Sequence, residues 1–237
     1  MALFVLADLH LSHAADKPMD VFGARWENHT EKILNNWQNT VAPEDTVVIP
    51  GDLSWGMDFG SSYEDLRFVH ALNGKKIIGK GNHDYWWQTM RKLTAFTAEN
   101  GLDTVNFLHN NAYYEQGFII CGTRGWTLAE NPSAADTQII LREAGRLRLS
   151  LESGAALKKL YPEAEILVFL HYPPAYGGLV CGPIADVLDE YGVRRCYYGH
   201  LHNIKTESLA SRAGNARLYC VSADLIGFKP MRIDRAD

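Results

Sequence analysis

The sequence has few of the features that mark secreted or membrane-bound proteins. It contains four cysteines in 237 residues, and none of them forms a CxxC pair. This excludes a dense disulfide framework and a thiolate zinc site, so we expect reduced thiols and a cytoplasmic protein. The apolar run at 2–7 has no basic segment before it and is far too short to span a bilayer. We therefore predict a first β-strand there and no membrane insertion.

Positive charge is also scarce. The chain has 23 Lys and Arg against 28 Asp and Glu, which gives a formal net charge of −5. Non-specific binding of nucleic acid requires Lys and Arg to neutralise phosphates. The basic residues between 142 and 159 form only a modest run, and such charges on an amphipathic helix usually form a solvated face. The composition thus disfavours a nucleic-acid partner.

What remains is the composition of a globular protein. Hydrophobic residues make up 46% of the chain, which is enough to bury a real core, and Gly and Pro are ordinary in number. There is no linker-like stretch and no internal repeat. The length is within the range of one large domain. We expect a single domain over 1–237.

Apolar runs rich in Val, Ile and Phe recur along the chain, and most end in a polar cluster. Short continuous runs of this kind are typical of strands buried on both faces. We predict such strands at 3–7, 46–50, 76–79, 118–121, 166–170 and 196–198. Helical patterns lie at 26–37, 63–72, 86–99, 139–160 and 184–191. Their alternation favours an α/β fold.

The last part of the chain has a different pattern. Strands are predicted at 204–209, 217–223 and 231–234, with no helix between them, which indicates a second, partly antiparallel sheet. The predicted fold is a four-layer α/β/β/α sandwich of two mixed sheets flanked by helices. The segment 122–137 has the least structure by composition, and we expect a loop over a site there.

Five polar clusters follow predicted strands. Ligands bind outside the carboxyl ends of strands in α/β sheets, so the clusters are expected to meet in one pocket. If these segments are extended, the two members of each Asp-x-His or His-x-His pair point the same way, with Leu9 and Leu201 facing the core. The clusters are Asp8-Leu9-His10, Gly51-Asp52, Gly81-Asn82-His83-Asp84, His171 and Gly199-His200-Leu201-His202.

The residue types in these clusters indicate metal binding. Imidazole, carboxylate and amide oxygen suit Mn, Fe, Zn or Ni, and the number of ligands fits two divalent ions better than one. Asp52 has two carboxylate oxygens and is the natural bridge. One ion is assigned to Asp8, His10, Asp52 and His202, and the other to Asn82, His171, His200 and the shared Asp52.

The ordered motifs DxH, GD, GNHD, H and GHxH resemble those of the calcineurin-like metallophosphoesterase family. The resemblance covers residues 3 to about 235. It is nearest to single-domain bacterial proteins described as predicted phosphohydrolases, which is carried by the segments 121–126 and 171–174. The start of the chain is also similar to pyrophosphatases that cleave UDP-diacylglucosamine, but these typically carry Arg where this chain has His83.

The motifs and the resemblance predict a metal-dependent phosphohydrolase. A hydroxide bridging two metal ions would attack a small phosphate ester or nucleotide in line. His83 is next to Asn82 but is not needed as a ligand, so we assign it as the general acid, with Asp84 holding its ring; the resemblance implies the same role for His83. Arg124 is assigned to a phosphate oxygen of the substrate.

Several alternatives stay open at this point. Asp84 can instead cap a helix, and the fold can serve as a silent metal-binding scaffold or as a nuclease. Tryptophans 26, 37, 86 and 87 are expected in the core, although Trp86, Trp87 or Trp126 can also wall a pocket. The natural substrate, the preference for monoester or diester, the native metals and the oligomeric state are not determined by the sequence.

Overall fold

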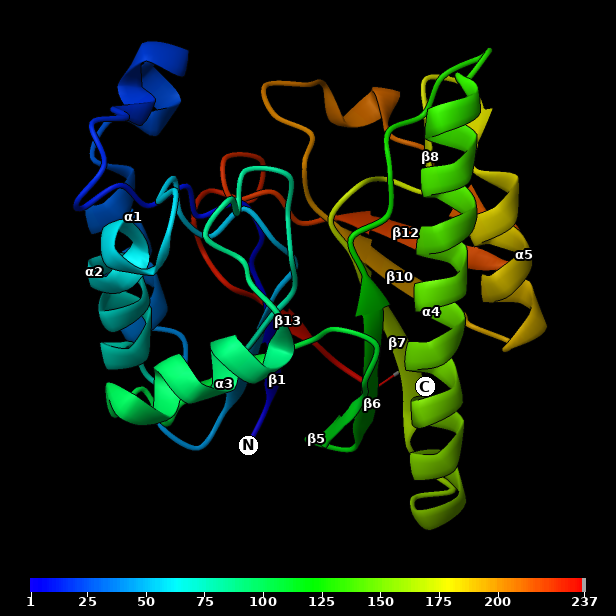
Figure 1. Cartoon of the computed structure of the whole chain (residues 1–237), viewed down its shortest axis with the longest axis horizontal. Helices are drawn as coiled ribbons and strands as arrows, with labels where there is room; N and C mark the ends of the chain where they lie inside the picture. The colour runs from blue at the N-terminus through cyan, green and yellow to red at the C-terminus, as the bar shows by residue number, and fades with distance from the viewer. Residues whose placement is uncertain (236–237) are drawn as a thin grey trace.

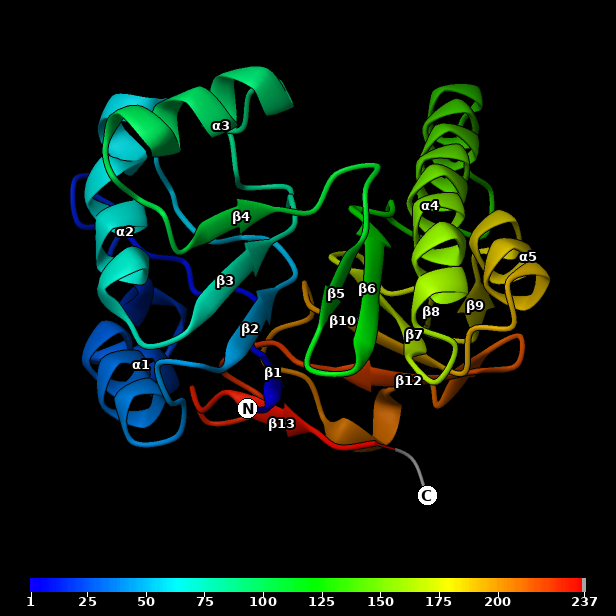
Figure 2. The ribbon, with the colours of Figure 1, turned by 90° about the horizontal axis from the view of Figure 1, so that it is seen from below.

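Two β-sheets pack face to face between two layers of helices (Figure 1). The structure is a computed structural model that describes residues 1–235, and the last two residues of the predicted 1–237 domain lie outside this range. Helices α1 to α3 cover the outer face of one sheet, and α4 and α5 cover the outer face of the other (Figure 2). The predicted four-layer α/β/β/α sandwich with two mixed sheets is confirmed.

The first sheet has the strand order β13-β1-β2-β3-β4. Strands β1 to β4 are parallel, whereas β13 is antiparallel to β1, so the last strand of the chain closes the edge beside the first. The strands are β1 (Leu3–Val5), β2 (Thr46–Ile49), β3 (Lys75–Ile78), β4 (Val105–Phe107) and β13 (Met231–Ile233).

The second sheet has the order β11-β12-β10-β7-β6-β5. Its four central strands are parallel, and both edge strands are antiparallel to their neighbours. A separate hairpin, β8 (Ala175–Tyr176) with β9 (Leu179–Val180), lies outside both sheets. The sheet strands are β5 (Tyr113–Glu115), β6 (Phe118–Thr123), β7 (Glu165–Leu170), β10 (Arg195–Tyr198), β11 (Arg212–Ala213) and β12 (Ala216–Cys220).

The helices connect the parallel strands within each half. Among residues 1–235, no helix combines the length and the apolar character that crossing a bilayer requires. All four cysteines are free, as predicted. The α-helices are α1 (His29–Gln38), α2 (Phe59–Ala71), α3 (Met90–Glu99), α4 (Ala134–Leu160) and α5 (Gly182–Glu190), and the 3₁₀ helices are η1 (Met19–Phe22), η2 (Ala24–Trp26) and η3 (Thr206–Ser208).

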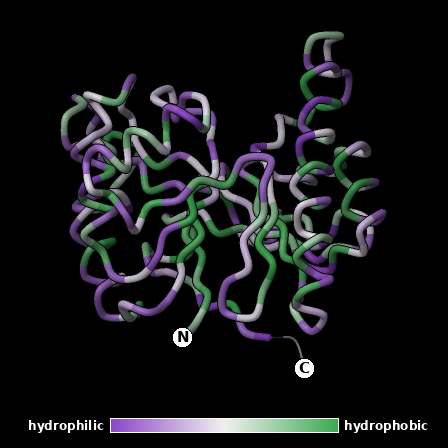
Figure 3. Tube along the Cα trace, turned by 60° about the horizontal axis from the view of Figure 1, so that its bottom comes forward, coloured by the Kyte–Doolittle hydropathy of each residue, from purple (hydrophilic) through white to green (hydrophobic). Residues whose placement is uncertain are grey.

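Strand alternation divides the core into three layers. In β1, Leu3 and Val5 pack between the two sheets, while Phe4 faces the helices of the first half. In β7, Leu167 and Phe169 also lie between the sheets. Successive side chains of a strand point to opposite faces of the sheet. Because the other sheet covers one face and helices cover the other, the central strands are apolar on both faces. Figure 3 shows these strands as hydrophobic segments in the middle of the molecule.

One predicted helix is wrong in extent, and one predicted strand is wrong in type. The helix predicted at 86–99 begins only at Met90, because the Thr89 side chain accepts the Lys92 N–H and caps it there. The strand predicted at 204–209 is instead an exposed 3₁₀ turn, where the Ser208 hydroxyl donates to the Lys205 carbonyl at 2.7 Å. Such local hydrogen bonds from a side chain to the backbone compete with the backbone hydrogen bonds of a β-sheet.

The tail does not form one sheet of its own. Strands β11 and β12 join the second sheet, and β13 joins the first. The predicted strand at 217–223 ends at Cys220, and the residues after it run toward the edge where the parallel strands of both sheets end. Strands β4 and β5, of three residues each, were not predicted.

Candidate metal centre

Each predicted ligand lies just beyond the carboxyl end of a parallel strand. The ligands after β1, β2 and β3 belong to the first sheet, and those after β7 and β10 belong to the second. Because the parallel strands of both sheets end at the same edge of the sandwich, seven residues that are far apart in the sequence come together there. They are Asp8, His10, Asp52, Asn82, His171, His200 and His202.

The first group of candidate ligands consists of Asp8, His10 and His202. One ligand atom from each lies within 4.8 Å of the others. His10 Nε2 is 3.3 Å from His202 Nε2, and His202 Nε2 is 4.0 Å from Asp8 Oδ1. Two imidazole nitrogens and a carboxylate oxygen thus point at one place.

The second group of candidate ligands consists of Asn82, His171 and His200, and the two histidines lie around the side-chain oxygen of Asn82. This Oδ1 is 2.7 Å from His171 Nε2 and 3.0 Å from His200 Nδ1. His171 is oriented from behind, since its Nδ1 is 3.2 Å from the carbonyl of Pro50. Its Nε2 is therefore turned to the centre.

Asp52 lies between the two groups. Its Oδ2 is 3.7 Å from His10 Nε2 and 3.4 Å from His171 Nε2. A single carboxylate oxygen thus faces one imidazole of each group, which is the geometry required of a bridging ligand.

The backbone at the ligands is not extended. Asp8, His10, Asp52 and His200 have φ values of 60°, 46°, 51° and 71°, in the left-handed region. The expectation that these segments are extended is therefore wrong, because the chain turns at these four residues after the strands end. Leu9 is fully buried, as predicted, whereas Leu201 is only partly buried.

Two glycines let the backbone approach the buried carboxylates closely. A Cβ on Gly81 would collide with the side chain of Asp52, and one on Gly199 would collide with that of Asp8. At these positions glycine is required for contact with a ligand rather than for a special backbone conformation.

Burial shifts the protonation of the ligands. It raises the pKa of Asp8 to about 7 and that of Asp52 to about 6, and it lowers the pKa of His171 to about 3 and that of His200 to about 3. Desolvation disfavours the charged form of each group. At these four positions the protein alone thus favours neutral side chains, and a bound cation would favour the carboxylates.

Asp224 supports His202, although no motif pointed to it. Its Oδ1 is 2.8 Å from His202 Nδ1, and its Oδ2 accepts the Asn203 N–H at 3.0 Å. A carboxylate behind a ligating histidine fixes the tautomer with the free Nε2. Asp224 follows β12, a strand of the second sheet, so the rule that found the other clusters applied to it as well.

Asp84 has a different environment from the one predicted. Its carboxylate accepts five N–H groups, none of which belongs to the His83 ring within residues 1–235, so Asp84 does not hold that ring. It is not a helix cap either, since α3 begins at Met90. The donors are the backbone of Asp52, Leu53, Ser54 and Gly81 and the indole of Trp86. Asp84 therefore fixes the loop that carries Asp52 to the loop that carries Asn82.

His83 lies beside the first group. Its backbone N–H donates to Asp52 Oδ1 at 2.8 Å, and its ring packs against Trp55, with ring centroids 4.3 Å apart. Its Nδ1 is buried and has no hydrogen-bond partner in the described part of the chain. Burial lowers its pKa, and Asp52 opposes that shift.

An aromatic pocket opens next to His83. It has a volume of about 240 Å³ and reaches His10 and His202 of the first group. The tryptophans in its wall are Trp26 and Trp55, whereas Trp86 and Trp87 are buried in the core as expected. The lining residues are His10, Met19, Phe22, Trp26, Trp55, His83, His202 and Asn203.

Arg124 begins the predicted loop. Residues 124–133 have no helix or strand, although α4 starts at Ala134, inside the segment 122–137. The Arg124 carbonyl accepts the N–H groups of His171 and Tyr172, and its guanidinium lies over Trp126 at 4.7 Å. The loop thus borders the second group.

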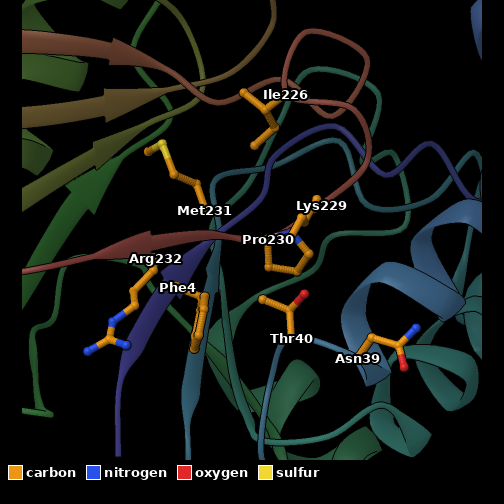
Figure 4. Close-up of a pocket in the computed structure, with 8 residues that line it drawn as sticks. All are labelled: Phe4, Asn39, Thr40, Ile226, Lys229, Pro230, Met231 and Arg232. Atoms are coloured by element: carbon orange, nitrogen blue, oxygen red, sulfur yellow. The ribbon is translucent and has the colours of Figure 1, made fainter.

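A cavity larger than the aromatic pocket lies away from this centre. It has a volume of about 570 Å³ and is formed by the end of α1, the middle of β1 and the approach to β13, including Phe4, Thr40 and Met231 (Figure 4). None of the predicted site residues lines it, so it adds nothing to the chemistry.

Comparison with protein families agrees with the motifs and the geometry. The calcineurin-like phosphoesterase profile matches residues 1–203. The chain belongs to the calcineurin-like phosphoesterase family. It is thus a metal-dependent phosphohydrolase, and the family is dimetal-dependent. The sequence matches no curated protein.

Solved structures show the calcineurin-like fold over almost the whole chain. A phosphopantetheinyl hydrolase from Mycobacterium tuberculosis has a TM-score of 0.54 and 13% identity, covering 98% of this chain and 95% of its own. A protein of unknown function from Aquifex aeolicus has a TM-score of 0.52 and 15% identity, again covering 98% of this chain and 95% of its own. A protein from Thermus thermophilus has a TM-score of 0.54 and 12% identity, covering 98% of this chain and 97% of its own. At these identities the likeness concerns the fold alone.

The donor set of this phosphoesterase fits two divalent ions. Asp8 and Asp52 are buried, and among residues 1–235 their only ion-pair partners are histidines. Two buried carboxylates without Lys or Arg are costly unless a cation neutralises them. Imidazole, carboxylate and amide oxygens are the ligands that such cations accept.

Proposed function

We propose that this phosphoesterase hydrolyses a phosphate ester of a small molecule or nucleotide at two divalent ions, with His83 as the general acid. The position of Asp52 carries the proposal, because one of its oxygens faces His10 and His171 from opposite groups. Asp8, His10 and His202 would hold one ion, Asn82, His171 and His200 the other, and Asp52 would bridge them. Mn, Fe, Zn and Ni all suit these ligands.

The bound ions would supply a water of lowered pKa and neutralise the phosphoryl oxygens. The chain itself provides orientation. Asp224 holds the His202 ring, the Pro50 carbonyl holds the His171 ring, and Asp84 joins the two loops that carry Asp52 and Asn82. These contacts fix the ligand atoms before the substrate arrives.

In this proposal, His83 would protonate the leaving oxygen. Its ring lines the aromatic pocket beside the first group of ligands, and its Nδ1 has no partner among the described residues, so the protein fixes neither tautomer. Burial lowers its pKa, but a bound phosphate dianion next to the ring would raise it again. The alcohol part of the ester would then lie against Trp55 and Trp26.

Replacing His83 tests this role. We expect His83→Ala to retain its metals and to lose about 100-fold or more in kcat on an alkyl phosphate, whose leaving group needs a proton. The loss on a nitrophenyl ester should be small, because nitrophenolate leaves without one. Metal content and both rates would be measured on the same preparation.

The control is His13→Ala. His13 is a partly exposed histidine that pairs with Asp65 rather than with the centre, so the ratio of the two rates should stay as in the wild type. Equal losses on both esters for His83→Ala would remove His83 from the general-acid role while leaving the metal assignment intact.

A further inference from the structure

A second cavity, of about 230 Å³, is lined by positive charge. Lys80 reaches it from the loop after β3, Arg124 from the end of β6, and Arg142 and Arg146 from α4. Among residues 1–235, Glu143 is the only acidic residue in its lining. We call this cavity the basic pocket. It concentrates four cations in a chain whose net charge is −5.

In the described part of the chain, only one of these four cations has an ion-pair partner. Glu143 pairs with Arg146 at 2.6 Å and also accepts the Thr123 hydroxyl at 2.7 Å. Lys80, Arg124 and Arg142 make no ion pair within residues 1–235. The Nε of Arg124 is buried there without a hydrogen-bond partner. A buried guanidinium donor with no acceptor is costly, and an anion in the pocket would provide one.

The basic pocket borders the second group of metal ligands. Lys80 is two residues before Asn82, and the Arg124 carbonyl accepts the His171 N–H at 3.1 Å. Tyr172 follows His171, and its ring lies 4.3 Å from that of His200. The aromatic pocket, by contrast, is lined by His10 and His202 of the first group. The two pockets therefore adjoin different groups of the same centre.

We infer that the basic pocket binds a phosphate group other than the one being hydrolysed. This rests on the proposed function and narrows its substrate class: the occupant is either a second phosphate of the substrate or the inorganic phosphate released. Arg guanidinium groups present a planar fork that matches phosphate oxygens, and Lys adds a point charge. The pocket has both.

Calorimetric titration with inorganic phosphate tests the pocket directly. The metal-loaded protein should bind two phosphates, and the chelator-treated full chain should still bind one. Arg142→Gln and Lys80→Met should each weaken phosphate binding at the metal-independent site about tenfold, because each removes one charge-assisted contact. Arg148→Gln removes the same charge from the same helix outside the pocket, where Arg148 pairs with Glu190, and should change affinity less than about twofold.

A pair of substrates distinguishes the two sources of phosphate. If the second group belongs to the substrate, the wild type should prefer a nucleoside 3′,5′-bisphosphate over the 5′-monophosphate in kcat/KM, and Arg142→Gln should reduce this preference about tenfold. If the occupant is the product, the preference should not change, and inhibition by phosphate should weaken instead.

Absence of phosphate binding to the chelator-treated chain, or equal effects of Arg142→Gln and Arg148→Gln, would overturn the inference. Failure of the proposed function has a different signature: there would be no metal-dependent turnover, yet the metal-independent phosphate site would persist.

Discussion

Four of the seven proposed ligands have a left-handed backbone, and this conformation is uncommon outside glycine. Asp8, His10, Asp52 and His200 all have positive φ. Each such residue costs on the order of 1–3 kcal/mol and persists only where its surroundings enforce it. Here the turns aim the side chains inward at the points where strands end, so the strain is concentrated at the proposed metal centre.

Gly81→Ala should disrupt this centre without replacing any of the proposed ligands. The added methyl would collide with the Asp52 carboxylate and move the bridging oxygen. We expect metal affinity to fall about tenfold or more, as with loss of a supporting contact. Isothermal titration with Mn²⁺ measures it.

Gly145→Ala is the matched control for this substitution. Gly145 lies within α4 with nothing within 4 Å of the new methyl, so metal affinity should not change. Helix propensity favours Ala by about 1 kcal/mol, so stability should rise slightly. If both variants bound metal like the wild type, close packing at Gly81 would not matter for the centre.

Metal binding should depend on pH near neutrality. Burial raises the pKa of Asp8 to about 7 and that of Asp52 to about 6, so protons occupy these carboxyls in the metal-free protein as the pH falls. His171 and His200, with pKa values of about 3, stay neutral. Burial lowers the pKa of His202, but its hydrogen bond to Asp224 and the nearby carboxylates outweigh burial and raise it, so this ring must also lose its proton before it binds metal. Affinity should thus be constant above about pH 8, fall about tenfold per unit below 7, and fall more steeply below 6.

Mn²⁺ affinity would be measured from about pH 5.5 to about 8.5, a range that spans both carboxyl transitions. The expected direction follows from competition: a proton must leave each carboxyl before it can ligate, so a lower pH weakens binding. If Mn²⁺ affinity stayed constant down to the acid end of this range, the raised pKa values of Asp8 and Asp52 would be contradicted.

At the residue scale, motif spacing was sufficient to find seven side chains that meet at one place, but not the residues that support them. Asp8, His10 and the other ligands occur in short, chemically distinctive clusters. Asp224 and Trp55 are single residues in ordinary surroundings, and their contacts with His202 and His83 depend on the packing of distant segments. The partners of Asp84 could not be predicted for the same reason, because four of them are backbone N–H groups.

At the scale of elements, the buried parallel strands were the most predictable. Runs such as those of β2 and β7 are apolar on both faces and end at polar clusters. Strands β4 and β5 have three residues each, too short for a period of two to stand out. Pairing is not encoded locally either, so the division of β11, β12 and β13 between two sheets could not be predicted from their sequences.

The junction of α2 and β3 depends on a buried lysine. Lys76 is fully buried, and its Nζ donates to the carbonyls of His70, Leu72 and Gly74 at 3.1, 2.6 and 2.7 Å. It satisfies acceptors at the carboxyl end of α2 and meets the negative end of the helix dipole. Burial lowers its pKa to about 8.

Lys76→Met should therefore destabilise the fold. Three carbonyls would lose their donor, and we expect the free energy of unfolding to fall by about 2 kcal/mol in urea denaturation near neutral pH. The control is Lys75→Met at the preceding position. Lys75 is partly exposed and pairs with Glu115 at 2.6 Å, which should contribute about 0.5 kcal/mol. Equal losses for the two variants would show that the carbonyl contacts contribute little.

At the scale of the whole molecule, the proposed centre joins the two sheets. Asp8, His10, Asp52 and Asn82 come from the first sheet, and His171, His200 and His202 come from the second. The fold class could be predicted from the alternation of elements, because each half must bury both faces of a parallel sheet. The prediction of a single domain over 1–237 remains a proposal, which this shared centre supports.

Removing the metals should lower the thermal stability of the whole chain. A ligand at a hundredfold excess over its Kd stabilises the folded state by about 2.7 kcal/mol, so a chelator should lower Tm by roughly 5–10 °C in a protein of this size. Differential scanning calorimetry measures the shift. Asp52→Asn, which weakens the bridge, should show a smaller response to chelator. A Tm indifferent to chelator in the wild type would argue against tightly bound ions.

The same distribution of ligands has a consequence for biosynthesis. His10 and His202 are 192 residues apart, and the second sheet supplies its three ligands only after most of the chain has left the ribosome. A nascent first half could offer Asp8, His10, Asp52 and Asn82 but no complete binding site. Metal acquisition would then follow translation, and the cell's free metal pool at that moment would determine which ions the mature enzyme carries.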